Sequence, residues 1–111
     1  MTRGDICLVS FPFTDGSAAK VRPVLIISAD RFNRGGDVVV LPISSSPEPG
    51  DEFSVYIPDP DFKAAGLRFP SAIKWNKPAT IAKSVVRRRL GALQDNYLSQ
   101  TTEKLKTVFD S

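Results

Sequence analysis

Two polar residues beside apolar segments have side chains suited to phosphate chemistry. Arg22 stands before Pro23 and the apolar run 24–27, and Ser44 ends a segment that begins at Val38. A guanidinium can form two parallel hydrogen bonds with a phosphate, and a hydroxyl can donate to a phosphoryl oxygen. Each residue also has a simpler interpretation, Arg22 as a partner in a surface ion pair and Ser44 as the residue that opens a turn. Position alone favours the simpler interpretation of both.

Basic residues are concentrated in the second half of the chain. The 111 residues include 15 Lys and Arg and 12 Asp and Glu, which gives a net charge of +3. Residues 1–61 carry 5 basic and 9 acidic side chains and residues 62–111 carry 10 and 3, so the two parts have net charges of −4 and +7. This asymmetry is typical of a protein that meets a polyanion such as a nucleic acid, and a merely solubilising surface is the alternative.

The densest basic region combines cations with aromatic rings. Lys74 and Lys77 flank Trp75, and three consecutive arginines occupy positions 87–89. Unpaired bases stack on aromatic faces such as those of Trp75 and Phe69, while the cations attract the phosphates. The alternatives are a solvated strand edge for the arginines and core packing or a dimer interface for Trp75.

The residues that are missing exclude several classes of site. The chain contains no histidine and one cysteine, Cys7, so Ser-His-Asp and Cys-His catalysis, an internal disulfide and a multi-cysteine metal site are excluded. No apolar run reaches the roughly 18–20 residues that span a bilayer, and the first residues lack the apolar stretch of a signal peptide. We therefore expect a cytoplasmic protein without a membrane segment.

Composition and pattern predict one small, mainly β domain over residues 1–111. Hydrophobic residues make up 41% and charged residues 24%, which excludes global disorder. Short apolar or alternating runs predict strands, and Gly, Pro and Ser between them predict loops or single helical turns. The expected strands are 6–11, 24–27, 38–41, 53–57, 71–75, 79–82 and 90–93, with a loop over 12–20 and helical turns within 28–34 and 59–65.

The pattern changes period near the end of the chain. Leu98, Thr101, Leu105 and Val108 repeat at intervals of three and four, and Asp95 is a candidate N-cap. This spacing predicts an amphipathic C-terminal helix that packs one side on a strongly bent sheet or small barrel.

Three sequence blocks together resemble the MazF/PemK family of toxin endoribonucleases. They are residues 3–9 (RGDICLV), 22–28 (RPVLIIS) and 38–44 (VVVLPIS), followed by a Pro-x-Thr-Ile stretch at 78–81 and the terminal helix. The resemblance covers nearly the whole chain. It implies an SH3-like small β-barrel, a homodimer with an RNA groove across its interface, and a cognate antitoxin whose tail occupies that groove. Contact with operator DNA through the antitoxin complex is a further expectation.

The resemblance also implies roles for residues. Arg22 and Ser44 map to family active-site residues, and similar proteins cut single-stranded RNA without a metal or cofactor, leaving a cyclic phosphate and a 5′-hydroxyl. Arg22 would stabilise the charge on the phosphorane and Ser44 would orient a phosphate oxygen. The residues expected to contact the RNA are Ser17, Lys20, Lys74, Asn76 and Lys77, with the loop over 15–20 covering it.

The sequence departs from the family pattern at Lys74-Trp75-Asn76, where PemK-type members carry Arg-x-Asp. Lys74 keeps a positive charge, but the amide of Asn76 cannot accept a proton, and Ser17 stands where some members have histidine. Two other functions therefore stay open. One is a family member that binds nucleic acid without cutting it, and the other is a CcdB-like inhibitor of a protein target such as gyrase.

Overall fold

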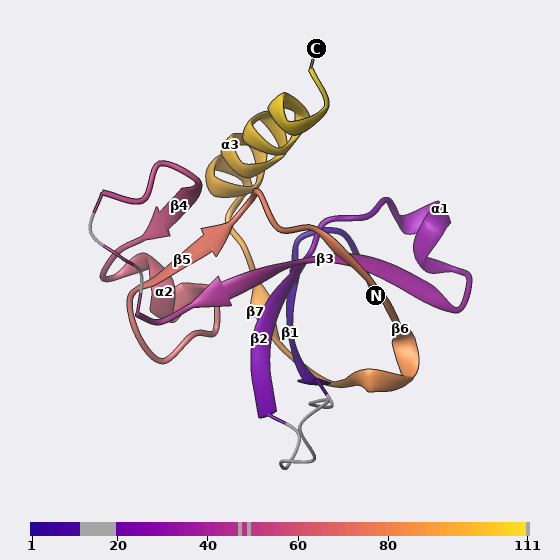
Figure 1. Cartoon of the computed structure of the whole chain (residues 1–111). Coiled ribbons are helices and arrows are strands. Elements are labelled where there is room, and N and C mark those ends of the chain that lie inside the picture. The colour runs from indigo at the N-terminus through magenta and orange to yellow at the C-terminus, as the bar shows by residue number, and fades with distance from the viewer. Residues whose placement is uncertain (12–19, 47, 49, 111) are drawn as a thin grey trace.

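The chain forms a bent antiparallel sheet that carries a C-terminal helix (Figure 1). The computed structural model describes residues 1–11, 20–46, 48 and 50–110. Its strands are β1 Asp5–Phe11, β2 Lys20–Ile26, β3 Asp37–Ser44, β4 Ser54–Ile57, β5 Ser71–Lys74, β6 Ala79–Ala82 and β7 Val86–Ala92. Its helices are α1 Asp30–Asn33, α2 Asp61–Ala64 and α3 Asp95–Lys106, with 3-10 turns at Lys83–Val85 and Thr107–Phe109.

The strands pair in the order β4-β5-β3-β2-β1-β7, and β6 pairs with β3 beside this path. Strand β3 is the centre of the sheet, because its first half pairs with β6, its middle with β2 and its end with β5. Among the described strands β4 and β7 do not pair, so the sheet is strongly bent without closing into a barrel. The predicted mainly β class with a terminal helix is confirmed.

Apolar side chains are buried on both faces of the sheet. Val24 and Ile26 of β2 pack with Cys7 and Val9 of β1 in one core cluster, whereas Leu25 packs on the opposite face with the side chains beneath α3. Successive residues of a strand point to opposite faces, so a run such as 24–27 is apolar throughout only when both faces are covered.

Strand β2 begins earlier than the sequence predicts. Proline cannot donate to a ladder, so we expected the strand to start at the sheet margin beside Pro23. The strand instead starts at Lys20, and Pro23 pairs with Leu8 of β1. Pairing with β3 begins only at Val24, so Pro23 is flanked by β1 alone. On the side toward β3 no backbone hydrogen bond is lost through the missing N–H of Pro23.

Strand β7 is also longer than expected, because it includes the arginine run at 87–89 as well as Leu90. Arg88 and Arg89 pair with Leu8 and Cys7 of β1, and β7 ends the pairing path. All three arginines are exposed, and Arg89 Nε lies 3.1 Å from Asp5 Oδ1. The strand-edge interpretation of this run is therefore confirmed.

Helix α3 packs across the sheet through most of the predicted apolar stripe. Thr101 is fully buried, and Leu98 and Leu105 pack on the core beneath them. Val108 is 45% exposed in the following 3-10 turn, so its assignment to the stripe was wrong. Asp95 is the first helical residue rather than the N-cap, a position that Gln94 occupies.

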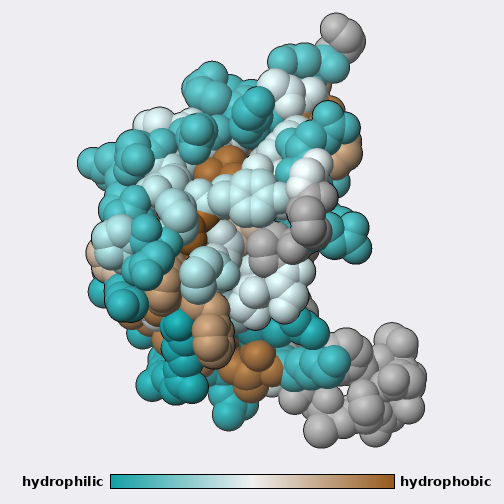
Figure 2. Space-filling view, turned by 90° about the vertical axis from the view of Figure 1, so that its left-hand side faces the viewer, coloured by the Kyte–Doolittle hydropathy of each residue, from teal (hydrophilic) through white to brown (hydrophobic). Residues whose placement is uncertain are grey.

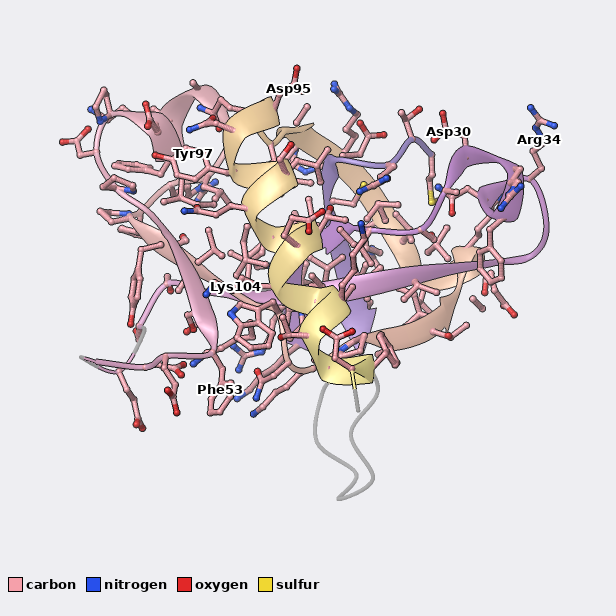
Figure 3. All side chains as sticks on the ribbon, turned by 90° about the horizontal axis from the view of Figure 1, so that it is seen from above. Asp30, Arg34, Phe53, Asp95, Tyr97 and Lys104 are labelled. Atoms are coloured by element: carbon pink, nitrogen blue, oxygen red, sulfur yellow. The ribbon has the colours of Figure 1, made fainter. Side chains whose placement is uncertain are left out.

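A hydrogen bond ties α3 to α2. Tyr97 lies on the side of α3 that faces α2 (Figure 3), and its hydroxyl donates to Asp61 Oδ2 at 2.5 Å. This bond to a carboxylate raises the pKa of Tyr97. No helix in the described part of the chain is long and apolar enough to cross a membrane.

Candidate active site

Arg22 and Ser44 lie at the same end of two neighbouring strands. Val24 of β2 pairs with Pro42 of β3. The pairing of β2 with β3 ends at this pair. Arg22 lies two residues before Val24, and Ser44 lies two residues after Pro42, where β3 pairs with β5 instead. Residues two apart in a strand share a face, so both side chains belong to the same face of the sheet. The fold thus places two residues that are 22 positions apart in the sequence beyond the same end of the β2–β3 pairing.

The surroundings of the pair leave it open to a ligand. Arg22 is exposed, and no ion pair among the described residues includes it. Ser44 is half-buried, and its Oγ accepts the backbone N–H of Ser46 at 3.2 Å. The turn-opening interpretation of Ser44 is therefore confirmed, and its hydroxyl hydrogen remains able to donate.

Lys20 lies on the same face as Arg22. It begins β2, is exposed, and pairs with Phe11 of β1. Ser17 and most of the loop expected to cover the RNA lie outside the described residues.

Lys74 faces the same side of the sheet and is held by a carboxylate. Its Nζ lies 2.5 Å from Asp51 Oδ2, and the two side chains are only 21% and 17% exposed. Asp51 also accepts the backbone N–H of Phe53 at 2.9 Å and the hydroxyl of Ser54 at 2.8 Å. The hydrogen bond with Lys74, followed by the other two, lowers the pKa of Asp51 to about 2, and the same bond raises the pKa of Lys74.

This ion pair predicts a loss of stability in acid. The pKa of Asp51 is about 2 in the folded chain against an ordinary value of 3.8, so its contribution is complete above about pH 4 and is lost as the pH falls toward 2. We expect Asp51→Asn to lower the free energy of unfolding at pH 7, measured by denaturant titration, and the difference from the parent chain to shrink at pH 2. Glu52→Gln, an exposed neighbour, is the control. An equal difference at both pH values would contradict the assignment.

Trp75 belongs to the core, so the expectation that it could stack a base was wrong. It is 7% exposed, and its ring meets Phe53 edge-on with centroids 5.4 Å apart. Neither Trp75 Nε1 nor Asn76 Oδ1, both buried, has a hydrogen-bond partner in the described part of the structure. Lys77 is exposed, and its backbone N–H donates to the Lys74 carbonyl at 3.3 Å.

Residues 2–109 match the family model described as a PemK-like, MazF-like toxin of type II toxin-antitoxin systems. The chain belongs to this family. A probable endoribonuclease MazF of Mycolicibacterium smegmatis is 32% identical over 106 residues, covering 95% of this chain and 93% of that protein.

Solved structures of MazF toxins share the fold. Toxin MazF-mt6 of Mycobacterium tuberculosis superposes with a TM-score of 0.76 at 24% identity, covering 96% of each chain. A mycobacterial endoribonuclease solved in complex with its cognate antitoxin has a TM-score of 0.79 at 17% identity, covering 98% of this chain and 94% of that one. At these identities the likeness establishes the MazF-type fold.

Tyr56 lies on the same face of the sheet as Ser44, and it is not among the residues predicted from the sequence. It pairs with Ala72 of β5, and Ala72 pairs with Ser44 of β3, so the three residues form one row across three strands. The alternating pattern of residues 53–57 indicates this position, because Tyr56 points to the face of the strand opposite the one that buries Val55 and Ile57. No group of three or more His, Cys, Asp or Glu residues able to hold a metal is present in the described ranges.

Proposed function

We propose that this chain is the toxin of a type II toxin-antitoxin system and cuts single-stranded RNA at specific sequences without a metal. The observation that carries the proposal is the placement of Arg22 and Ser44 at the same end and on the same face of neighbouring strands. Membership of the toxin family and 32% identity to a probable endoribonuclease over 106 residues support it.

In the proposed reaction the ribose 2′-oxygen attacks the adjacent phosphorus and the bond from phosphorus to the 5′-oxygen breaks. The 2′-hydroxyl loses its proton to water, the 5′-oxygen gains one, and the products are a cyclic phosphate and a 5′-hydroxyl. Arg22 stabilises the charge that develops on the phosphorane, and Ser44 donates its hydroxyl to a phosphate oxygen. Arg22 is also the candidate donor of the proton to the leaving oxygen. Asn76 takes no proton, because an amide is not a base at neutral pH.

Further contacts extend from this pair along the RNA. Lys20 and Lys74 lie on the same sheet face as Arg22, and Lys77 and Asn76 follow Lys74. With Ser17 they are the proposed RNA-binding residues. The proposed partners are a cognate antitoxin and a second copy of the chain, with operator DNA reached through the antitoxin complex, and the proposed location is the cytoplasm.

The decisive test is cleavage of a mixed RNA by the purified chain in EDTA, with the cut ends mapped and their chemistry determined. We expect one pattern of cut sites with cyclic phosphate and 5′-hydroxyl ends. Intact RNA together with growth arrest on expression would favour an inhibitor of a protein target instead.

A second candidate function is RNA binding without cleavage, and the observation that favours it is the amide of Asn76 in the position where PemK-type members have a carboxylate. This function predicts binding that weakens steeply with salt and yields no cyclic phosphate. The same EDTA experiment therefore separates the two functions.

A further inference from the structure

A pocket of about 450 Å³ lies at the sheet edge where β3 and β4 end and β5 begins. Tyr56 and Phe69 contribute aromatic side chains to its lining, Ser45 and Ser71 contribute hydroxyl groups, and Pro58 adds a further apolar surface. Pockets of roughly 300–1,000 Å³ are usual for small organic ligands. The space is therefore large enough for one planar heterocycle.

Both aromatic rings of the pocket are accessible, with Tyr56 42% and Phe69 60% exposed. The Tyr56 hydroxyl donates to the Glu48 carbonyl at 3.1 Å, which holds the ring in place. The Phe69 carbonyl accepts the hydroxyl of Ser71 at 2.7 Å, which anchors the backbone that carries the second ring. Such anchored, exposed rings are the surfaces on which unpaired bases stack.

The pocket adjoins the candidate active site. Ser45 follows Ser44 directly, and Tyr56 stands two strands from Ser44 in the row through Ala72. Neighbouring strands lie about 4.8 Å apart, which separates Tyr56 from Ser44 by roughly 10 Å. A nucleotide whose phosphate lies at Ser44 can therefore place its own or an adjacent base in the pocket.

Cations and apolar side chains surround this part of the surface. A neighbouring groove of about 390 Å³ shares Ser45, Phe69 and Ser71 with the pocket, and Arg68 and Arg88 line it. Figure 2 shows the side of the molecule with β4, β5 and α2, where brown apolar side chains gather in the lower half among teal hydrophilic ones. Pro23 and Leu8 also line the neighbouring groove, and Arg88 pairs with Leu8, so Arg88 lies on the other face of the sheet from Arg22.

We propose that the pocket between Tyr56 and Phe69 binds one unpaired base of the RNA next to the cleaved phosphodiester, and so contributes to the choice of cleavage sequence. The proposal rests on the proposed function, because the base is delivered by the RNA held at Arg22 and Ser44.

The test compares variants of the two rings with a matched exposed phenylalanine. Tyr56→Ala and Phe69→Ala remove a stacking surface, Tyr56→Phe keeps the ring, and Phe32→Ala removes a side chain that is 47% exposed on α1. Figure 3 places α1, marked by Asp30 and Arg34, far from Phe53 at the start of β4. Binding is measured at fixed salt with an RNA that spans the mapped cut site and carries a 2′-deoxy sugar there.

We expect each alanine variant of the pocket to bind this RNA roughly 5- to 150-fold more weakly, the range found when a base-stacking ring is removed. Phe32→Ala should stay close to the parent chain. Tyr56→Phe keeps the ring but loses its hydrogen bond to the Glu48 carbonyl, so it should fall between the parent chain and Tyr56→Ala. In cleavage of mixed RNA, the pocket variants should lose base preference at one position beside the cut. An RNA that is abasic at that position should bind the parent chain and Tyr56→Ala equally.

The outcomes distinguish the pocket from the proposed function. If the parent chain cuts no RNA, the proposed function and the pocket assignment are both wrong. If it cuts RNA and the pocket variants behave like Phe32→Ala, or lose activity equally at all sites, only the pocket assignment is wrong. The pocket assignment would also be wrong if Tyr56→Ala and Phe69→Ala lost antitoxin binding or dimer formation while their RNA binding stayed unchanged. Phe69→Ala carries the test if Tyr56→Ala does not fold, because Phe69 is the more exposed ring.

Discussion

Replacing Arg22 by alanine should lower kcat for RNA cleavage by roughly 10³-fold or more, because an arginine that stabilises charge on a transferring phosphoryl group typically contributes about 10³–10⁵. The side chain is exposed and no described ion pair includes it, so the free energy of unfolding should change by less than about 0.5 kcal/mol. The measurement is single-turnover cleavage of a defined RNA by a variant shown by circular dichroism to be folded. Expression of the variant should no longer arrest growth.

Two further variants make the Arg22 result specific. Arg22→Lys keeps the charge but not the bidentate geometry, so it should fall between the parent chain and Arg22→Ala. Arg34→Ala removes an exposed arginine next to α1 and should cut RNA at the parent rate. Full cleavage by Arg22→Ala would remove Arg22 from the active site.

Replacing Gly91 by alanine should destabilise the fold by about 3 kcal/mol or more. A Cβ at Gly91 would lie 2.4 Å from the Ala65 carbonyl oxygen and 2.8 Å from its carbon, both of which are backbone atoms. Overpacking typically costs about 1–3 kcal/mol, and backbone cannot swing aside as a flexible side chain does. Thermal unfolding should show a decrease in Tm of about 10 °C or more.

Gly66 tests the same contact from the opposite segment. Its added Cβ would lie 2.3 Å from the Leu90 carbonyl oxygen, and its φ of +89° adds a backbone conformation that alanine disfavours. Gly66→Ala should therefore be at least as destabilising as Gly91→Ala. Gly36→Ala is the matched control, because no heavy atom lies within 4 Å of its added Cβ. Equal Tm values for Gly91→Ala and Gly36→Ala would show that the segment around Gly66 can move away from β7.

This close contact also bears on function. It fixes the chain between α2 and β5, which continues through Leu67 to Phe69 and lines the pocket and the neighbouring groove. A variant that loosens it should therefore reduce sequence preference at temperatures where the fold still persists.

Local sequence patterns determined the strands and the C-terminal helix of this protein and the chemical type of its candidate active-site residues. Apolar runs bounded by Pro, Gly and Ser predicted seven strands, and the three-four repeat predicted the C-terminal helix, because these periods reflect which faces of an element are buried. Arg22 and Ser44 were identified as phosphate-binding types beside strand ends, and the sequence blocks around them indicated the family. The length of β7 was missed because an arginine run is uncommon in strands and is tolerated here only at the end of the pairing path.

Tertiary structure alone decided which of these residues meet. Strand order places Arg22 and Ser44 beyond the same end of the β2–β3 pairing, and the register puts Tyr56 in one row with Ser44. The packing of the sheet buries Trp75 and joins Lys74 to Asp51 across 23 residues. The backbone contact between Gly66 and Gly91 likewise depends on how α2 packs beside β7. Such contacts join segments far apart in the chain, and a local pattern specifies which face of a strand is buried without specifying which strand lies beside it.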